Sequence, residues 1–120
     1  LSDIPTIRWM PEPEGYLTTR WLTCFTLAGE DATARCDALM RSMERHSIEM
    51  RPVWKPMHLQ PLFHNAPYFP HAEGADVSRR LFETGVCLPS GSNLSEEQQD
   101  RVIAHLRRVL SQPEDRRALV

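Results

Sequence analysis

The residue types best suited to chemistry lie together in residues 50–61, which read MRPVWKPMHLQP. Side chains alternate along an extended chain, so Arg51 and Lys55 are expected on one side of it, with Val53 between them. Two cations on one side can bind a phosphate or diphosphate, because a guanidinium binds phosphate through two parallel hydrogen bonds and an ammonium attracts it as a point charge. Two solvated cations on an edge strand are the plainer interpretation, and composition alone favours it.

The same segment offers an indole, an imidazole and an amide, from Trp54, His58 and Gln60. Trp54 could stack on a planar ligand or simply fill a core. His58 could donate a hydrogen bond to a ligand or transfer a proton, and it could equally be a packed histidine with its partners inside the protein. His64 and His71 follow His58 in a proline-rich stretch without carboxylates or cysteines, at no recognised ligand spacing, so no metal site is predicted.

The three cysteines, Cys24, Cys36 and Cys87, have an odd count and wide spacing, which indicate neither a disulfide framework nor a zinc motif. Reduced, mostly buried thiols in a cytoplasmic protein are expected. Ser90-Gly91-Ser92 lacks the flanking residues of a nucleophile elbow, and the chain has no glycine-rich phosphate loop. No catalytic nucleophile is therefore predicted.

Composition limits the classes of function. The chain has 120 residues, 41% hydrophobic and 25% charged, with a formal net charge of -2, which is typical of one folded soluble domain. Such a balance does not favour nucleic acid or an anionic membrane as a partner. No apolar run is long enough for a membrane span, and residues 1–5 carry no signal-peptide pattern. The domain is also small for a cofactor enzyme with its own substrate pocket.

The segments that must position these residues follow from periodicity. Strands are expected at residues 21–27, 48–54 and 86–88, and Pro52 makes the second an edge strand. Helices are expected at 32–46, at 76–84 with Gly85 as the stop, and from Ser95 with a Gln98 capping box to Pro113. Residues 4–16 should be an irregular or edge segment and residues 56–70 a long loop. The expected fold is an α+β two-layer sandwich of an about three-stranded sheet with helices.

The expected apolar faces comprise Phe25 and Leu27 in the first strand; Ala32, Cys36, Leu39, Met40 and Met43 in the first helix; Val77, Leu81 and Phe82 in the second; and Val102, Ile103, Leu106, Val109 and Leu110 in the third.

Three blocks of the sequence resemble the C-terminal region of the DegT/StrS-type (DegT/DnrJ/StrS) sugar aminotransferases: residues 51–61, residues 81–94 and, more weakly, residues 19–22. The resemblance covers nearly the whole chain. It implies that residues 1–120 are the small C-terminal domain of a fold-type-I, pyridoxal-phosphate-dependent, homodimeric enzyme. Such enzymes move an amino group, usually from glutamate, onto a nucleotide-linked keto sugar for surface polysaccharide, glycoprotein or related aminosugar synthesis.

The resemblance also implies roles for single residues. Lys55, the only lysine of the sequence, belongs to the small domain and not to the Schiff-base position. The catalytic lysine and the cofactor contacts would then lie outside this chain, and the chain alone should be inactive. Arg51 and Lys55 are expected to pair with the diphosphate, and Trp54 to shape the site and stack on the substrate. His58 is expected to form a hydrogen bond with the sugar or phosphate, and Gln60 to line the same substrate entrance.

Two other functions stay open at this point. The apolar loop at residues 61–69 could be the partner surface of a stand-alone interaction module. A small metal-binding protein using the loop histidines is the third reading, and the absence of ligand spacing disfavours it.

Overall fold

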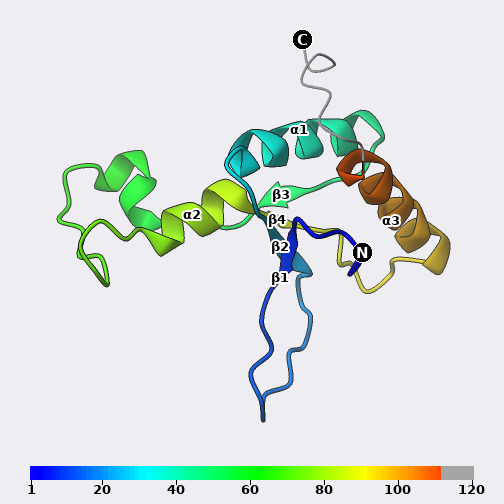
Figure 1. The fold of residues 1–120 in the computed structure, drawn as a ribbon, viewed down its shortest axis with the longest axis horizontal. Coiled ribbons are helices and arrows are strands. Elements are labelled where there is room, and N and C mark those ends of the chain that lie inside the picture. Colours follow the sequence, from blue (N-terminus) through cyan, green and yellow to red (C-terminus); the bar gives the residue numbers. More distant parts are fainter. Residues whose placement is uncertain (112–120) are drawn as a thin grey trace.

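The computed structural model describes residues 1–111, and it has the expected α+β architecture (Figure 1). A four-stranded antiparallel sheet has the order β1-β2-β4-β3. Along the chain, the elements are β1 (Ile7–Trp9), β2 (Cys24–Leu27), α1 (Ala32–Arg45), β3 (Arg51–Pro52), the 3-10 turns η1 (Met57–Leu59) and η2 (Pro61–Phe63), α2 (Val77–Thr84), β4 (Gly85–Cys87) and α3 (Glu96–Leu110).

The sheet has one strand more than expected. β1 lies between Pro5 and Pro11, so the prolines flank the strand without interrupting its ladder, and Ile7 pairs with Leu27 of β2. The proline-rich stretch is therefore an edge strand over these three residues. β3 is the other edge strand, as Pro52 predicts, and it is only two residues long.

The core lies between one face of the sheet and the helices α1 and α3. Phe25 and Val86 pair across β2 and β4, and neither has any exposed surface. The predicted stripe of α1 is buried against them, with Leu39 and Met43 almost fully enclosed and Met40 at the margin. The main cluster comprises Ile4, Ile7, Phe25, Leu27, Ala32, Cys36, Leu39, Met43, Ile48, Val86, Val102 and Leu106.

Helix α3 begins as the sequence predicts. The Ser95 hydroxyl accepts a hydrogen bond from the Gln98 backbone N–H at 3.2 Å, and the Gln98 side chain accepts one from the Ser95 N–H at 2.9 Å. The helix ends at Leu110, where the N–H of Ser111 bonds the Arg107 carbonyl. Pro113, the expected stop, lies outside the described residues. None of the helices within residues 1–111 combines the length and apolar character that crossing a membrane requires.

A polar cluster that the sequence pattern did not indicate joins α1 to α3. His105 is only 6% exposed, and its ring packs on that of His46 with centroids 4.0 Å apart. One guanidinium nitrogen of Arg108 lies 3.0 Å from His46 Nε2 and 2.7 Å from His105 Nδ1. Ser42 lies 3.2 Å from the other His105 nitrogen, and Arg101 donates to the His46 carbonyl.

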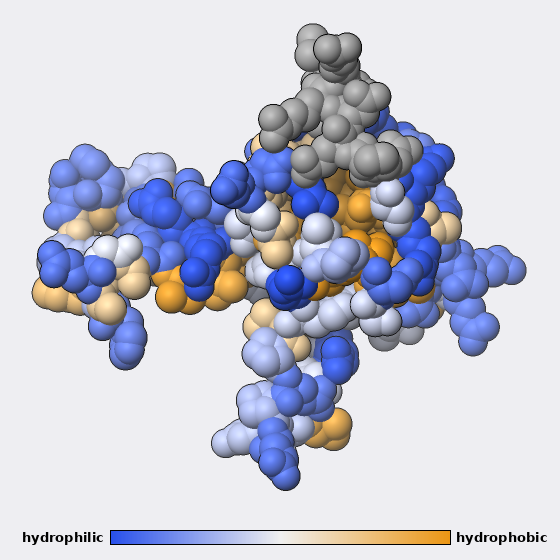
Figure 2. Space-filling view, viewed as in Figure 1, coloured by the Kyte–Doolittle hydropathy of each residue, from blue (hydrophilic) through white to orange (hydrophobic). Residues whose placement is uncertain are grey.

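Two arms extend from the body (Figure 1). One is the loop joining β1 to β2, and the other holds η1, η2 and the start of α2. The second arm is more regular than the expected loop, because Pro56 and Pro61 each start a 3-10 turn. Apolar side chains remain exposed on both arms (Figure 2), including Leu17 at 89% and Phe69 at 85%.

Helix α2 has the expected apolar stripe but buries little of it, since Val77 is 49% and Leu81 38% exposed. The helix points outward into the second arm, so only its last turn reaches the body (Figure 1). It ends at Thr84 as predicted, and Gly85 starts β4 without an intervening loop. A Cβ at Gly85 would lie 2.4 Å from the Leu81 carbonyl oxygen and 2.8 Å from Val53 Cγ2, so glycine is needed there for space.

Candidate functional site

An open cavity of about 670 Å³ lies at the side of the sheet where the edge strand β3 pairs with β4. It brings together three of the five predicted site residues, Arg51, Trp54 and Lys55. The other lining residues come from the segments before β2 and β3, from β3 and the residue after it, from the end of α2, and from β4 and the turn that follows it: Leu22, Glu49, Pro52, Val53, Phe82, Cys87, Leu88, Pro89, Ser90 and Gly91.

Backbone pairing fixes the segment that carries these residues. Arg51 pairs with Cys87 across β3 and β4, and the Val53 N–H donates to the Gly85 carbonyl at 3.0 Å. Beyond Val53 the chain leaves the sheet toward η1. All five residues from Arg51 to Lys55 therefore line the cavity, and the alternation expected for a longer regular strand ends here.

Arg51 is well exposed but already has an anionic partner. Its guanidinium contacts the Glu49 carboxylate at 2.6 and 2.7 Å, with the two side chains 78% and 71% exposed. An exposed pair of this kind contributes about 0–1 kcal/mol to stability. A guanidinium also has five N–H donors, so it can bind a second anion while it contacts Glu49.

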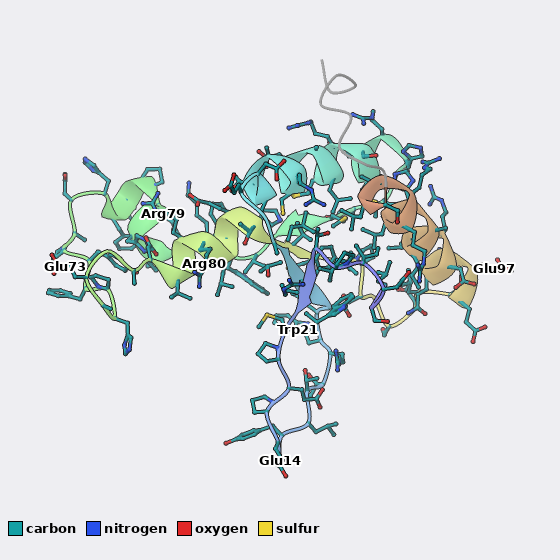
Figure 3. The ribbon with its side chains drawn as sticks, viewed as in Figure 1. Glu14, Trp21, Glu73, Arg79, Arg80 and Glu97 are labelled. Atoms are coloured by element: carbon teal, nitrogen blue, oxygen red, sulfur yellow. The ribbon has the colours of Figure 1, made fainter. Side chains whose placement is uncertain are left out.

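Two tryptophans form an exposed aromatic surface at the cavity. Trp54 is 62% and Trp21 75% exposed, and their ring centroids are 6.1 Å apart at a tilt of 35°. Trp21 lies where the first arm joins the body (Figure 3). The sequence had placed it in a buried strand over residues 21–27, but β2 begins at Cys24, after Arg20 adopts a positive φ of 52°. Exposed indoles side by side are suited to stacking on a planar group.

Lys55 completes the cavity from the side of α2. Its Nζ lies 6.0 Å from the centroid of the Phe82 ring, at the outer limit of a cation–π contact. The ammonium thereby extends over an apolar wall and can donate to a ligand in the cavity. Arg51 and Lys55 line the same cavity, and their binding of phosphate stays a prediction.

His58 and Gln60 lie in the second arm and are not among the residues that line the cavity. His58 is 14% exposed in its side chain, lies 2.8 Å from an Asp76 carboxylate oxygen, and stacks on Tyr68 with ring centroids 3.8 Å apart. Gln60 donates to the Lys55 carbonyl at 3.2 Å. Both side chains thus hold the arm together within the chain, and their predicted ligand contacts stay predictions.

Asp76 is the centre of this arm, and sequence reasoning missed it. Its carboxylate accepts from the Arg79 N–H at 2.9 Å, capping α2, and from Tyr68, Ser78 and the Arg79 side chain. Partial burial acts to raise the pKa of Asp76, but the donors from Arg79, His58 and Ser78 outweigh it and hold that pKa well below its usual range. An aspartate just before a helix is a recognised cap signal, so it could have been found.

Within the described residues, no group of three or more His, Cys, Asp and Glu side chains is placed to hold a metal ion. His64 and His71 are exposed in the second arm. The chemistry that the cavity offers is anion binding by two cations and stacking on exposed indoles.

Comparison with known proteins identifies the family of this architecture. Residues 1–107 match the DegT/DnrJ/EryC1/StrS aminotransferase family. The chain is 43% identical over 103 residues to EpsN of Bacillus subtilis (strain 168), described as a pyridoxal phosphate-dependent aminotransferase. That match covers 86% of this chain and 26% of EpsN. The chain is also 33% identical over 106 residues to GDP-perosamine synthase of Caulobacter vibrioides, covering 82% of this chain and 26% of that protein.

Solved structures show the same fold. The aminotransferase TlmJ from Streptoalloteichus hindustanus superposes with a TM-score of 0.74 at 21% identity, covering 92% of this chain and 28% of TlmJ. A DegT DnrJ EryC1 StrS aminotransferase from Brucella abortus gives a TM-score of 0.67 at 22% identity, covering 89% of this chain and 27% of that one. The chain therefore spans about a quarter of the length of the proteins that it matches.

Proposed function

The chain belongs to the DegT/DnrJ/EryC1/StrS aminotransferase family, and from this premise we propose that it is the C-terminal substrate-capping domain of a sugar aminotransferase. The observation that carries the proposal is the cavity that gathers Arg51, Trp54 and Lys55. The whole protein would aminate a nucleotide-linked keto sugar for surface polysaccharide, glycoprotein or related aminosugar synthesis.

The residues that line the cavity support a nucleoside diphosphate as the part of the substrate that this domain binds. Arg51 and Lys55 supply two cations to the same cavity, which suits a diphosphate. Trp54 and Trp21 add an exposed aromatic surface next to them, which suits a planar base. One relative is named GDP-perosamine synthase, which associates a nucleoside diphosphate with its product.

The family implies pyridoxal phosphate, whose ring acts as an electron sink for amino-group transfer when it is bound. The described residues do not fit that cofactor by themselves. Lys55 is the only lysine of the sequence, and its Nζ faces the Phe82 ring at 6.0 Å. Arg51 is paired with Glu49. We therefore assign the Schiff-base lysine and the cofactor contacts to the part of the protein outside this chain, and expect the chain alone to be inactive.

The remaining partners follow from the same proposal. Glutamate would be the amino donor, the whole enzyme would be a homodimer, and it would act in the cytoplasm. The exposed apolar residues of the two arms, among them Leu17 and Phe69, would then contact the large domain or the second subunit.

A stand-alone interaction module is the second candidate function. Leu62 is 84% and Phe69 85% exposed on the second arm, which is the surface that such a module would use. The same exposure is expected of a capping domain separated from its neighbours, and the cavity that gathers Arg51 and Lys55 favours the capping domain.

Titration of the isotopically labelled chain with a UDP-sugar and a GDP-sugar, followed by NMR, tests the proposal. Shifts are expected in residues 51–55 and 87–91, and Arg51→Gln or Lys55→Gln should each weaken binding by roughly tenfold to a hundredfold, as loss of one hydrogen bond to a charged group does. Arg80→Gln is the matched control, because Arg80 is an exposed cation on α2 outside the cavity. Equal weakening by all three variants, or shifts confined to residues 61–69, would contradict the proposal.

A separate titration with pyridoxal phosphate tests the assignment of Lys55. Little absorbance from a Schiff base is expected at stoichiometric cofactor. Borohydride reduction followed by peptide mapping identifies any amine that has reacted. A stoichiometric adduct on Lys55 would overturn its assignment to the substrate side of the active site.

A further inference from the structure

Two of the three cysteines face each other across adjacent strands. Cys24 of β2 pairs with Cys87 of β4, and their sulfur atoms are 3.4 Å apart. The Leu88 N–H donates to the Thr23 carbonyl at 2.9 Å, which makes Cys24 and Cys87 a non-hydrogen-bonded antiparallel pair. Cα atoms of such pairs are about 4.5 Å apart, within the range that a disulfide spans.

The geometry requires little movement for a bond to form. A disulfide has a sulfur–sulfur distance of about 2.05 Å, so the two sulfurs must approach by roughly 1.4 Å, which side-chain rotation alone can supply. Both cysteines are unbonded in the structure. Wide spacing in the sequence concealed this pair, because the antiparallel register of β2 and β4 brings the two residues together.

The pair also lies at the candidate site. Cys87 lines the cavity, and on its other side it pairs with Arg51 of β3. Arg51, Cys87 and Cys24 thus form one row across three strands. Cys36 is different, because it is 2% exposed in the core and its thiol contacts the Thr84 carbonyl oxygen at 3.1 Å.

We propose that Cys24 and Cys87 form an oxidisable two-thiol site, which a hydroperoxide converts to a disulfide at the floor of the cavity. Cys24 is the more exposed of the two and reacts first. Its sulfur attacks the peroxide, the O–O bond breaks, and a sulfenic acid and one alcohol or water molecule form. The sulfur of Cys87 then attacks that of Cys24, and the sulfenic oxygen leaves as water with the Cys87 proton. Two thiols lose two electrons in total, and the peroxide gains them.

The state of Cys87 agrees with this order of events. Burial, together with the neighbouring Cys24 thiol, raises the pKa of Cys87 to about 12. Cys87 therefore stays protonated at neutral pH, which leaves the more exposed Cys24 as the thiol that meets the peroxide first. The resulting cross-link would join β2 to β4 next to Arg51 of β3. Reversible bonds of this type are the form in which disulfides act in reducing compartments.

Tryptic mapping of the oxidised chain tests the proposal without any substrate. Cleavage at arginine separates the three cysteines onto residues 21–35, 36–41 and 81–101. After hydrogen peroxide treatment, quenching and alkylation in denaturant, the first and third peptides should be joined with the loss of two hydrogen atoms, and the second should carry one alkyl group. Dithiothreitol should restore three alkylated peptides.

Single cysteine variants separate the proposed pair from other cross-links. Cys36→Ser should cross-link at the wild-type rate, whereas Cys24→Ser should leave the 81–101 peptide alkylated and unjoined. In the oxidised wild type, the indole N–H resonance of Trp54 should shift, since the bond forms in the cavity floor. A cross-link to residues 36–41, a bond between two molecules, or three alkylated thiols after oxidation would each overturn the proposal. The mapping stands independently of nucleotide-sugar binding.

Discussion

At the scale of single residues, the contacts of Arg108 with His46 and His105 are expected to depend on pH. Arg108 lies within hydrogen-bond distance of both His46 and His105, and it can donate to them only while each ring presents an unprotonated nitrogen. Arg101 adds a second positive charge beside His46. Burial, followed by the charges of His46 and Arg108, lowers the pKa of His105.

The predicted consequence is loss of stability on acidification. A histidine whose pKa is lower in the folded state binds more protons when unfolded, so the free energy of unfolding rises with pH through the unfolded pKa of about 6.5. Urea unfolding should therefore give a lower midpoint at pH 5.5 than at pH 7.5. His105→Gln should reduce this pH dependence.

His64→Gln is the matched control, because His64 is exposed on the second arm. It should retain the wild-type dependence on pH. If both variants show the same profile as the wild type, His105 is not the group that links stability to pH.

At the scale of the element, helix α3 has the clearest local determinant. In the capping box, the side chains of Ser95 and Gln98 each accept a hydrogen bond from the other residue's backbone N–H at the start of the helix. Ser95→Ala should lower the free energy of unfolding by about 1 kcal/mol, since removal of a cap hydroxyl costs about 0.5–2 kcal/mol. Thermal unfolding followed by circular dichroism measures the change.

Ser111→Ala provides the comparison at the other end of α3, where the cap is made by the backbone N–H of Ser111. That substitution leaves the N–H in place and should have little effect. Equal destabilisation by the two variants would mean that the Ser95 side chain contributes nothing beyond general helix propensity.

At the scale of the whole molecule, we expect stability to depend on the body, which holds the buried core, and little on the arms. Leu39 is 1% and Leu62 84% exposed, so the same substitution can be compared at both sites. Leu39→Ala should lower the free energy of unfolding by about 2–5 kcal/mol, whereas Leu62→Ala should change it by less than about 0.5 kcal/mol. Chemical denaturation of the two variants measures this, and similar losses would show that the second arm is part of the cooperative unit.

The sequence predicted the body well because its elements have strong periodicity. The helix stripe through Leu39 and the cap at Ser95 depend on neighbours in the chain, and the structure confirms both. The fourth strand could not be predicted, because three residues between prolines acquire strand structure only by pairing with β2. The prediction for the second arm failed for a different reason. An apolar stripe such as that of α2 predicts burial, but it does not say which part of the protein covers it.

The candidate site was predicted in part. Arg51, Trp54 and Lys55 are close in the chain, so their convergence follows from local geometry. Trp21 reaches the same region only through the fold, and its role depends on where β2 begins. His58 and Asp76 are separated by a long arm, so their 2.8 Å contact could not be read from spacing.

The direct passage from α2 into β4 has a mechanical consequence. No loop separates Thr84 of α2 from Gly85 of β4. The Leu81 carbonyl oxygen and the Val53 side chain occupy the space that a side chain at position 85 would need. The outer end of α2 is fastened through Asp76 to His58 and Tyr68. Helix and strand are thus continuous, with no loop between them to absorb a change in their relative position. A displacement of the second arm by a docked neighbour would therefore be passed on to Cys87 and the cavity wall.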